Sequence, residues 1–337
     1  LNKQNMYVKR QYGLGMLVKW TKFAIFYAIV YVSILTTIYY ILKKHYNISF
    51  FLPWEPVGVL GIAVAFYLGF KNNASYDRTW EARKIWGSIT NNSRIFSSQL
   101  VTFVQGENKN EIIEEIVNRH IAWLTALRFQ LRLEKEWEHT KERLNHMFTP
   151  TVCSIYLAQL DDAIMDNIVD DEFELYKGKS NIAIQILAKQ SVRIQELANL
   201  ENIENFRDLA LLDTIKTFYT DQGQSERIKN FPFPRQYASI AFWLTIVFSA
   251  AIPFGMLDIF SSISEYHVWL TIPVASSLIW IFYLMEIIGD YSENPFEGTY
   301  NDVPITAIAR NIEIDMLEII GAQKIPEPIV ASNGVLM

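Results

Sequence analysis

The chain has 337 residues, of which 50% are hydrophobic and 20% charged, and its formal net charge at pH 7 is −6. It is too apolar for an average soluble protein and too charged for one embedded throughout in lipid, so a membrane part joined to a soluble part is expected. The net negative charge, without a basic stripe, argues against a nucleic-acid partner. The single cysteine, Cys153, excludes an internal disulfide.

The first predicted membrane span covers residues 23–42, an uncharged run that Lys43 and Lys44 close. Its many Ile, Val and Tyr residues would suit a strand in water, but an uninterrupted run of this length favours a spanning helix. Tyr39 and Tyr40 stand where an interfacial aromatic belt is expected.

A second apolar run, residues 57–70, follows a predicted chain break at Pro53, Glu55 and Pro56. The run is short for a span exposed to lipid, and its small residues allow close helix packing. These small residues are Gly58, Gly61, Ala63, Ala65 and Gly69. We therefore expect a helix that is surrounded by protein and continues through residues 72–94, beyond the membrane.

Three large apolar residues of this run, Ile62, Phe66 and Phe70, recur at a spacing of four and so share one helix face. On an arbitrary helix such a stripe indicates core packing. A stripe that faces a lumen is the alternative.

The continuation of this helix is dense in charged, amide and aromatic side chains. They are Asn72, Asn73, Tyr76, Asp77, Arg78, Trp80, Glu81, Arg83, Lys84 and Trp86. Charges of both signs within two helical turns favour mutual ion pairs, so we expect a structural lattice at the base of the helix. An acid–base catalytic site is the alternative.

Residues 92–221 are predicted to be soluble and helical. Apolar residues at helical spacing mark helices over residues 111–133, 180–200 and 204–219, with Gly223 as a stop. The acidic stretch over residues 161–174 is expected to be a solvated surface. A vestibule that attracts cations is the alternative.

Residues 237–257 and 268–285 are two more uncharged runs, separated by a short polar link. They predict a helical hairpin through the membrane, which Pro253 and Pro273 would kink or end. A short amphipathic helix is expected over residues 305–319, before a Pro-containing tail.

Four spans place both termini on one side of the membrane, and basic residues near the span ends favour the cytoplasm for that side. Those residues are Lys19, Lys22, Lys71, Arg78, Arg83 and Lys84, against Lys43 and Lys44 opposite. Glu286 and Asp290 are expected to mark the return of the last span to water. We therefore predict a multi-pass protein of the cell (inner) membrane.

No catalytic motif is found: the sequence contains no G-x-S-x-G, phosphate loop, H-E-x-x-H or G-x-G-x-x-G. The five histidines are scattered, and His139 and His146 stand seven residues apart in a charged stretch. No metal site, no cofactor and no enzymatic activity are expected.

Three stretches resemble the bestrophin family, specifically its compact prokaryotic branch. They are GFKNNASYDRTWEARKIWG at residues 69–87, FPFPRQY at 231–237 and ENPFEGTYNDVP at 293–304. Residues 106–221 match only loosely. The resemblance implies an all-α protein with four transmembrane helices and a helical cytosolic region, assembled as a homopentamer around a central pore.

In such a pentamer the resemblance places Ile62, Phe66 and Phe70 in a pore neck, as stacked apolar rings that gate by dewetting. It places a second, cytosolic aperture at Ala183, with Ile182 beside it. Two phenylalanines and one isoleucine are similar to the pattern of anion-conducting members, and aromatic edges favour anions. Passive conduction of a monovalent anion such as chloride is therefore favoured, with a sodium channel of the same architecture as the alternative.

Animal bestrophins bind calcium through an acidic run after their NPF motif. Here that position, residues 297–302, has only Glu297 and Asp302 as acids, so coordination of calcium is not expected.

The resulting organisation has four parts. Residues 1–94 hold the first two spans and the base of the pore helix, 95–230 the cytosolic region, 231–304 the other two spans, and 305–337 an amphipathic helix and tail. A secondary transporter would need inverted repeats and polar sites at the membrane midplane, and the sequence shows neither. A membrane-anchored sensory or scaffold protein remains as a third function.

Overall fold

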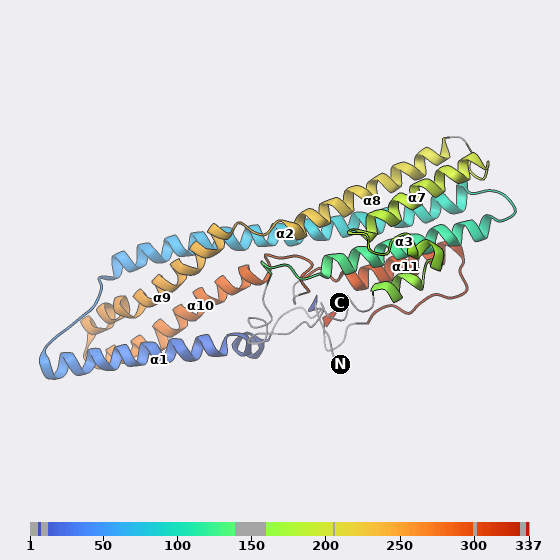
Figure 1. The fold of residues 1–337 in the computed structure, drawn as a ribbon. Coiled ribbons are helices and arrows are strands. Elements are labelled where there is room, and N and C mark those ends of the chain that lie inside the picture. The colour runs from blue at the N-terminus through green and yellow to red at the C-terminus, as the bar shows by residue number, and fades with distance from the viewer. Residues whose placement is uncertain are drawn as a thin grey trace. The chain divides into compact units, whose positions relative to one another are not determined.

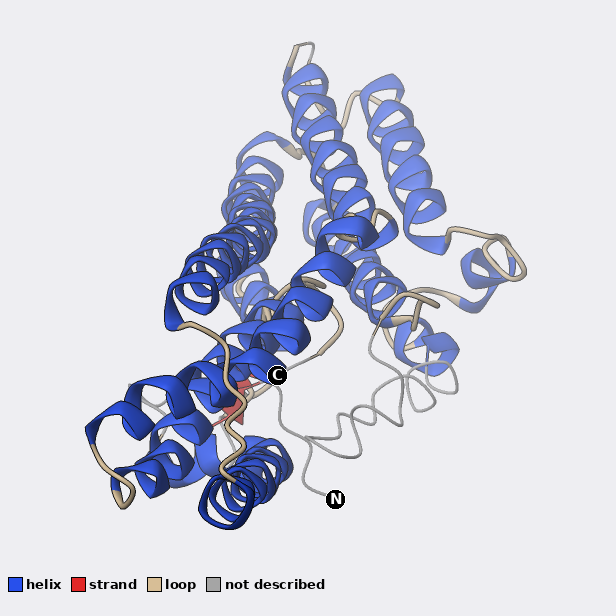
Figure 2. Cartoon of the chain, turned by 90° about the vertical axis from the view of Figure 1, so that its left-hand side faces the viewer, coloured by secondary structure: helices blue, strands red, loops and turns tan. Residues whose placement is uncertain are grey.

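The computed structural model describes residues 6–7, 13–138, 160–204, 206–298, 302–330 and 335–336. Helices make up nearly all of this part of the chain (Figure 2). The strands in it are β1 (Met6–Tyr7) and β2 (Val335–Leu336), which pair antiparallel. The expected all-helical fold is confirmed. Cys153, His139 and His146 lie outside the described residues.

The chain divides into two compact units. The transmembrane unit comprises Lys9–Asp77 and Pro232–Glu293, and the head unit comprises Leu1–Val8, Arg78–Phe231 and Asn294–Met337. The boundary thus falls inside a helix, between Asp77 and Arg78. The four-part organisation inferred from the sequence stays a prediction.

The transmembrane unit is built from apolar helices, and α10 lies between α1 and α9 (Figure 1). Its elements are α1 (Leu14–Tyr46), the first part of α2 (Trp54–Phe103), α9 (Arg235–Ile263), the 3-10 helix η1 (His267–Leu270) and α10 (Thr271–Tyr291). Four stretches are long and apolar enough to cross a membrane: Thr21–Tyr46, Trp54–Phe103, Arg235–Ile263 and His267–Tyr291. The four expected spans are therefore present as helices.

Helix α2 is a single helix of 50 residues. It begins at Trp54, so Glu55 and Pro56 lie in its first turn and do not break the chain. Proline is tolerated there because the first N–H groups of a helix have no partner inside the helix. For the same reason Pro273 fits the first turn of α10, whereas Pro253 lies inside α9 without ending it.

Glycines let α2 and α9 approach closely, as the small residues of α2 predict. A Cβ atom on Gly61 would lie 2.7 Å from the ring of Phe248, and one on Gly255 would lie 2.9 Å from Trp54. At both positions a side chain would require its neighbour to move. These close contacts lie within the apolar core of the unit. The core includes Val32, Val57, Val64, Leu68, Phe248, Ile252, Met256 and Ala275.

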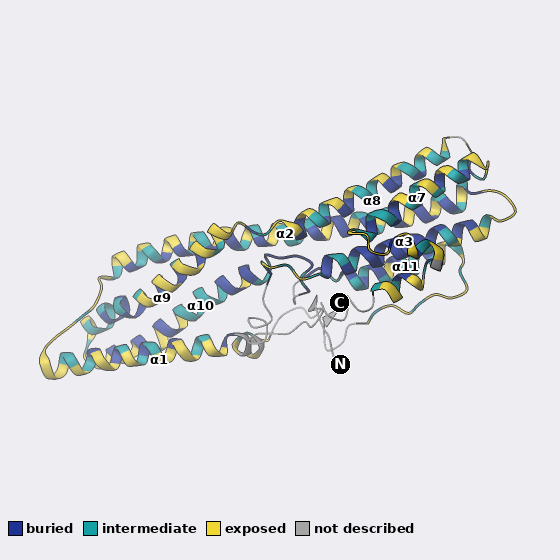
Figure 3. Cartoon of the chain, viewed as in Figure 1, coloured by how far each residue is buried: buried dark blue, intermediate teal, exposed yellow. Residues whose placement is uncertain are grey.

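The head unit packs its helices around α3, whose residues are mostly buried (Figure 3). Its elements are the second part of α2, α3 (Lys109–Arg132), α6 (Asp170–Glu174), α7 (Ile182–Asn199), α8 (Arg207–Asn230) and α11 (Ile305–Ile320). The predicted stop at Gly223 is wrong, because α8 continues to Asn230. Gly223 keeps helical geometry, whereas Gly321, in the left-handed region at φ 73°, ends α11.

Candidate functional site

The apolar stripe of α2 lies on the surface of the transmembrane unit. Ile62, Phe66 and Phe70 are 74%, 67% and 59% exposed. The rings of Phe66 and Phe70 contact edge to face, with centroids 4.6 Å apart. Val64 and Leu68, which face the other way, are fully buried. The stripe is therefore not part of the core of a single chain.

The opposite face of α2 is held by polar contacts as well as by the core. At its start, the Trp54 N–H donates to Oδ2 of Asp258 on α9 at 3.3 Å. At the other end, the Lys71 Nζ lies 2.9 Å from Oε1 of Glu286 and 3.6 Å from Oδ1 of Asp290. These contacts fix the rotation of α2 that turns the stripe outward.

The cluster of Lys71, Glu286 and Asp290 corrects an expectation. Their side chains are 1%, 4% and 9% exposed, so the two acids of α10 do not mark a return to water. Each buried carboxylate needs a nearby cation, because an isolated charge is costly to bury. The sequence signal that could have indicated this cluster is the position of one basic and two acidic residues at the ends of apolar runs.

Side chains of α2 also pack closely against the backbone of α10 near this cluster. A Cβ atom on Gly289 would collide with Oδ1 of Asn72. Asn73 and Asp77 lie on the exposed side of α2. The residues of the predicted lattice are thus divided between the face of α2 that packs against α10 and the face that is exposed.

In the head unit, the lattice residues find partners on α8. Arg78 donates to the carbonyl oxygens of Ile228 at 3.1 Å and Phe231 at 2.8 Å. Glu81 binds Arg227 with a separation of 2.5 Å. Arg78 and Glu81 therefore bind partners from a distant part of the sequence, and the structural lattice itself stays a prediction.

The remaining lattice residues differ in exposure. Asp77 and Arg83 are exposed and form no ion pair with a described residue. Tyr76 and Trp80 are 58% and 48% exposed, whereas Trp86 is fully buried and packs near Phe296. Of the aromatic residues in the predicted lattice, two thus lie at the surface and one lies in the core.

The residues expected at the aperture stand at the start of α7. Ala183 is fully buried in the core of the head unit, while Ile182 is half-buried. Ile182 borders a cavity of about 130 Å³, which is also lined by Ala126, Phe129, Gln130, Leu133, Leu160, Lys179 and Ser180. Of the two residues, only Ile182 has side-chain surface that solvent reaches. The aperture itself stays a prediction.

Amide side chains fix the start of α7. The Asn181 Oδ1 caps the helix by accepting the N–H of Ile184 at 3.1 Å. Oε1 of Glu226 on α8 accepts hydrogen bonds from Asn181, Gln222 and Gln130 at 2.9, 2.7 and 2.9 Å. One carboxylate therefore ties α3, α7 and α8 together beside Ile182.

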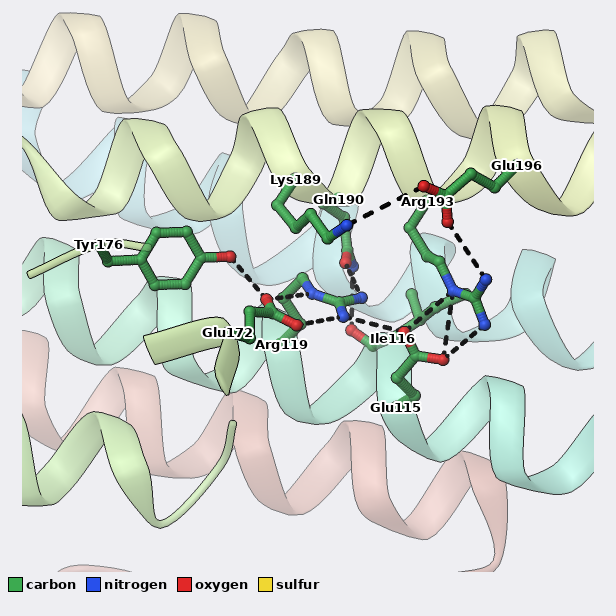
Figure 4. Close-up of polar contacts among 9 residues, drawn as sticks. All are labelled: Glu115, Ile116, Arg119, Glu172, Tyr176, Lys189, Gln190, Arg193 and Glu196. Carbon is green, nitrogen blue, oxygen red and sulfur yellow. Dashed lines mark hydrogen bonds and ion pairs between the residues drawn. The ribbon is translucent and has the colours of Figure 1, made fainter. Parts of the chain in front are cut away.

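A second network joins α3, α6 and the middle of α7 (Figure 4). Arg119 binds both oxygens of Glu172 at 2.6 Å and Oε1 of Glu115 at 2.9 Å. Arg193 binds Glu115 from the other side at 2.9 Å, and Tyr176 donates to Glu172 at 2.6 Å. The paired forks of arginine and carboxylate give this network a defined geometry.

The charges of this network compensate one another, which argues for a structural role. Burial raises the pKa of Glu172, but the hydrogen bonds from Arg119 and Tyr176 outweigh it and leave that pKa below its ordinary value. Glu172 comes from the acidic stretch expected to be solvated. That expectation is wrong for this residue, because the guanidinium of Arg119 covers it.

The loop after α10 is organised by Asp302. Its Oδ1 accepts the N–H groups of Phe296 and Val303 at 2.7 and 2.6 Å. Its Oδ2 accepts from Gly298 at 2.6 Å and from Arg132 at 2.5 Å. Both oxygens are thus engaged in folding the loop. Among the residues that the structure describes, no group of three or more His, Cys, Asp and Glu side chains could hold a metal ion.

These features define a helical membrane protein in which one face of α2 packs against the other helices and the opposite face exposes an apolar stripe. The profile of the family described as Bacterial/Fungal Bestrophin protein matches residues 18–318, and the chain belongs to this family. The resemblance seen in the sequence is confirmed.

Relatives cover most of the chain. A voltage-dependent anion channel-forming protein of Ralstonia nicotianae is 29% identical over 287 residues, 85% of this chain and 83% of the relative. One of Escherichia coli K12 is 25% identical over 295 residues, covering 84% and 85%. The crystal structure of a bacterial bestrophin homologue from Klebsiella pneumoniae shares the fold, with a TM-score of 0.73 at 22% identity over 90% of this chain and 99% of that one. Family and relatives point to ion channels and not to enzymes.

Proposed function

We propose that the chain assembles as a homopentamer around an axial pore and passively conducts monovalent anions such as chloride. The exposed stripe of Ile62, Phe66 and Phe70 carries this proposal. The other face of this helix packs against its own chain. Exposed large apolar side chains on such a helix are expected to contact lipid, another subunit or a lumen.

The course of the exposed face along α2 favours a lumen. Beyond Phe70 the same exposed side of the helix bears Asn73 and Asp77. A face that turns from apolar to amide and carboxylate along its length suits a water-filled path that narrows at an apolar neck. Relatives named as anion channel-forming proteins support the same assignment.

The neck would select among ions through direct contact between the ion and the side chains, since its rings carry no charge. Positive edges of the phenylalanine rings favour an anion passing in the plane of the ring. Ile182 is the proposed aperture residue, in place of the buried Ala183. Sodium conduction is the second candidate, favoured by the net charge of −6 and by the exposed carboxylate of Asp77, which forms no ion pair with a described residue.

The setting of the pore follows from the distribution of basic residues. More of them flank the spans on the side of the two termini, so the proposed location is the inner membrane with both termini cytoplasmic. The permeant ion, the lipid bilayer and sibling subunits are the proposed partners.

Three measurements test the proposal. The protein–detergent complex should contain protein of about five times the 39.1 kDa chain mass, and a monomer that keeps its fold would remove the pore. The reversal potential in a bilayer under a NaCl gradient should lie near the chloride equilibrium potential, and a value near that of sodium would reject anion selectivity. Phe66→Ala should widen the neck, raise the current and weaken ion discrimination, whereas an unchanged variant would reject the neck.

A further inference from the structure

Helix α2 carries an acid on each side of its apolar stripe, on the same face. At 100° per residue, Ile62, Phe66 and Phe70 occupy an arc of about 80° around the helix axis. Glu55 and Asp77 both fall inside this arc. Glu55 precedes Ile62 by seven residues and Asp77 follows Phe70 by seven, so each stands about 10 Å along the axis from the nearest end of the stripe.

These two acids differ in exposure and pairing from Glu286, Asp290 and Glu293 of the same unit. Glu55 and Asp77 are exposed and form no ion pair with a described residue. Glu286 and Asp290 are buried beside Lys71, and Glu293 binds Arg235 at 3.2 Å. The two acids on the stripe face thus keep uncompensated charge, which reaches whatever the stripe faces.

We propose that Glu55 and Asp77 form acidic rings at the two mouths of the neck and set how readily each ion enters it. This assignment rests on the proposed pore. In a pentamer each position is repeated in every subunit, so each mouth carries several negative charges. Such rings hold cations at the mouths and repel anions, in opposition to the preference of the aromatic neck.

The two rings act on entry from opposite sides, which gives the proposal a signature. Glu55→Gln should raise chloride current that enters from its mouth, and Asp77→Asn should raise chloride current that enters from the other. The two variants should therefore rectify in opposite senses, and the double variant should restore a symmetric response. A merely structural role of either residue would not produce opposite rectification.

The experiment records currents of the full-length protein in planar bilayers, in symmetric and asymmetric NaCl. At 0.1 M salt each variant should change the chloride-to-sodium permeability ratio about threefold, as expected for several screened charges about 10 Å away. At 1 M salt the Debye length falls from about 10 Å to about 3 Å, so the change should almost vanish. Glu265→Gln removes an exposed carboxylate of the same unit that lies off α2, and should change neither rectification nor permeability ratio.

The outcomes separate this inference from the proposed function. If Phe66→Ala alters the current while Glu55→Gln and Asp77→Asn leave rectification and permeability unchanged, the acidic rings are rejected and the neck stands. An effect of equal size at 0.1 and 1 M salt would also reject the rings. Native protein that carries no current would overturn the proposed function and this assignment with it. All variants should match the native assembly mass.

Discussion

The two units of the chain distribute apolar and charged side chains in opposite ways. The transmembrane unit exposes large apolar residues such as Phe66 and encloses charges such as Lys71. The head unit encloses a broad apolar core and places much of its charge in partly exposed networks such as that of Arg193. Exposure therefore has to be interpreted separately for each unit, because the transmembrane unit is built from helices long and apolar enough to cross a membrane.

Buried ion pairs sharpen this comparison, because both units contain one. Lys71 and Glu286 are 1% and 4% exposed, and Arg119 and Glu172 are 5% and 10% exposed. The arginine makes two bonds to Glu172 and has a second acid nearby, whereas the lysine makes one short contact to Glu286 and a longer one to Asp290. The loss of either cation strands carboxylates, but fewer alternative donors remain around Glu286 than around Glu172.

The largest effect is expected for Lys71→Met. It leaves Glu286 and Asp290 buried without their cation, which costs roughly 3–5 kcal/mol for a fully buried group. We expect most of the folded oligomer to be lost, measured as the monodisperse fraction in mild detergent. Lys71→Arg keeps the charge and should lose much less. A stable, monodisperse Lys71→Met protein would show that another group balances the charge of these acids.

A smaller effect is expected for Arg119→Met in the head unit. Tyr176 still donates to Glu172, and Arg193 still binds Glu115, so the cost should be about 2–3 kcal/mol. The matched control is Arg193→Met, whose side chain is 23% exposed and whose loss should cost about 1 kcal/mol. Chemical or thermal unfolding compares the two. Equal losses would contradict the buried arginine as the centre of the network.

The third effect appears on acidification and concerns His120. This side chain is enclosed by the rings of Phe96, Trp123 and Phe218, and burial lowers its pKa to about 3. Between that value and about 6.5 the unfolded chain binds a proton that the folded chain does not, so stability falls as pH falls. The loss from pH 7 to pH 5 should be about 2 kcal/mol.

The measurement is the unfolding midpoint of detergent-purified protein at both pH values. His120→Gln removes the titrating group and should flatten this part of the profile, even if its stability at pH 7 is lower. A native profile that stays flat between pH 5 and 7 would contradict a neutral, buried His120.

The sequence was sufficient for the spans and the stripe, since both depend on local patterns. An uncharged run of adequate length specifies a membrane helix, and a spacing of four specifies a face. The ion pairs could not be predicted, because Lys71 meets Glu286 and Glu81 meets Arg227 only after distant helices pack. Gly223 misled for a related reason, as tertiary packing of α8 overrides its low helix propensity.

The site itself was only half visible in the sequence. Composition marks residues 72–86 as unusual, yet it does not separate the buried Trp86 from the exposed Asp77. That separation follows from the phase of α2, which Gly61, Gly289 and the Lys71 cluster set together.

The glycine contacts of α2 have a consequence for how such proteins diverge. A larger residue at Gly61 or Gly289 would force the side chain of Phe248 or Asn72 to move, because each occupies the space that a Cβ atom would need. Ile62, Phe66 and Phe70 stand on the opposite side and touch little of their own chain. Inherited changes on the outward side are therefore free of the packing constraint that fixes the inward side. A lineage can alter what α2 presents on its outward side while the helix keeps its place.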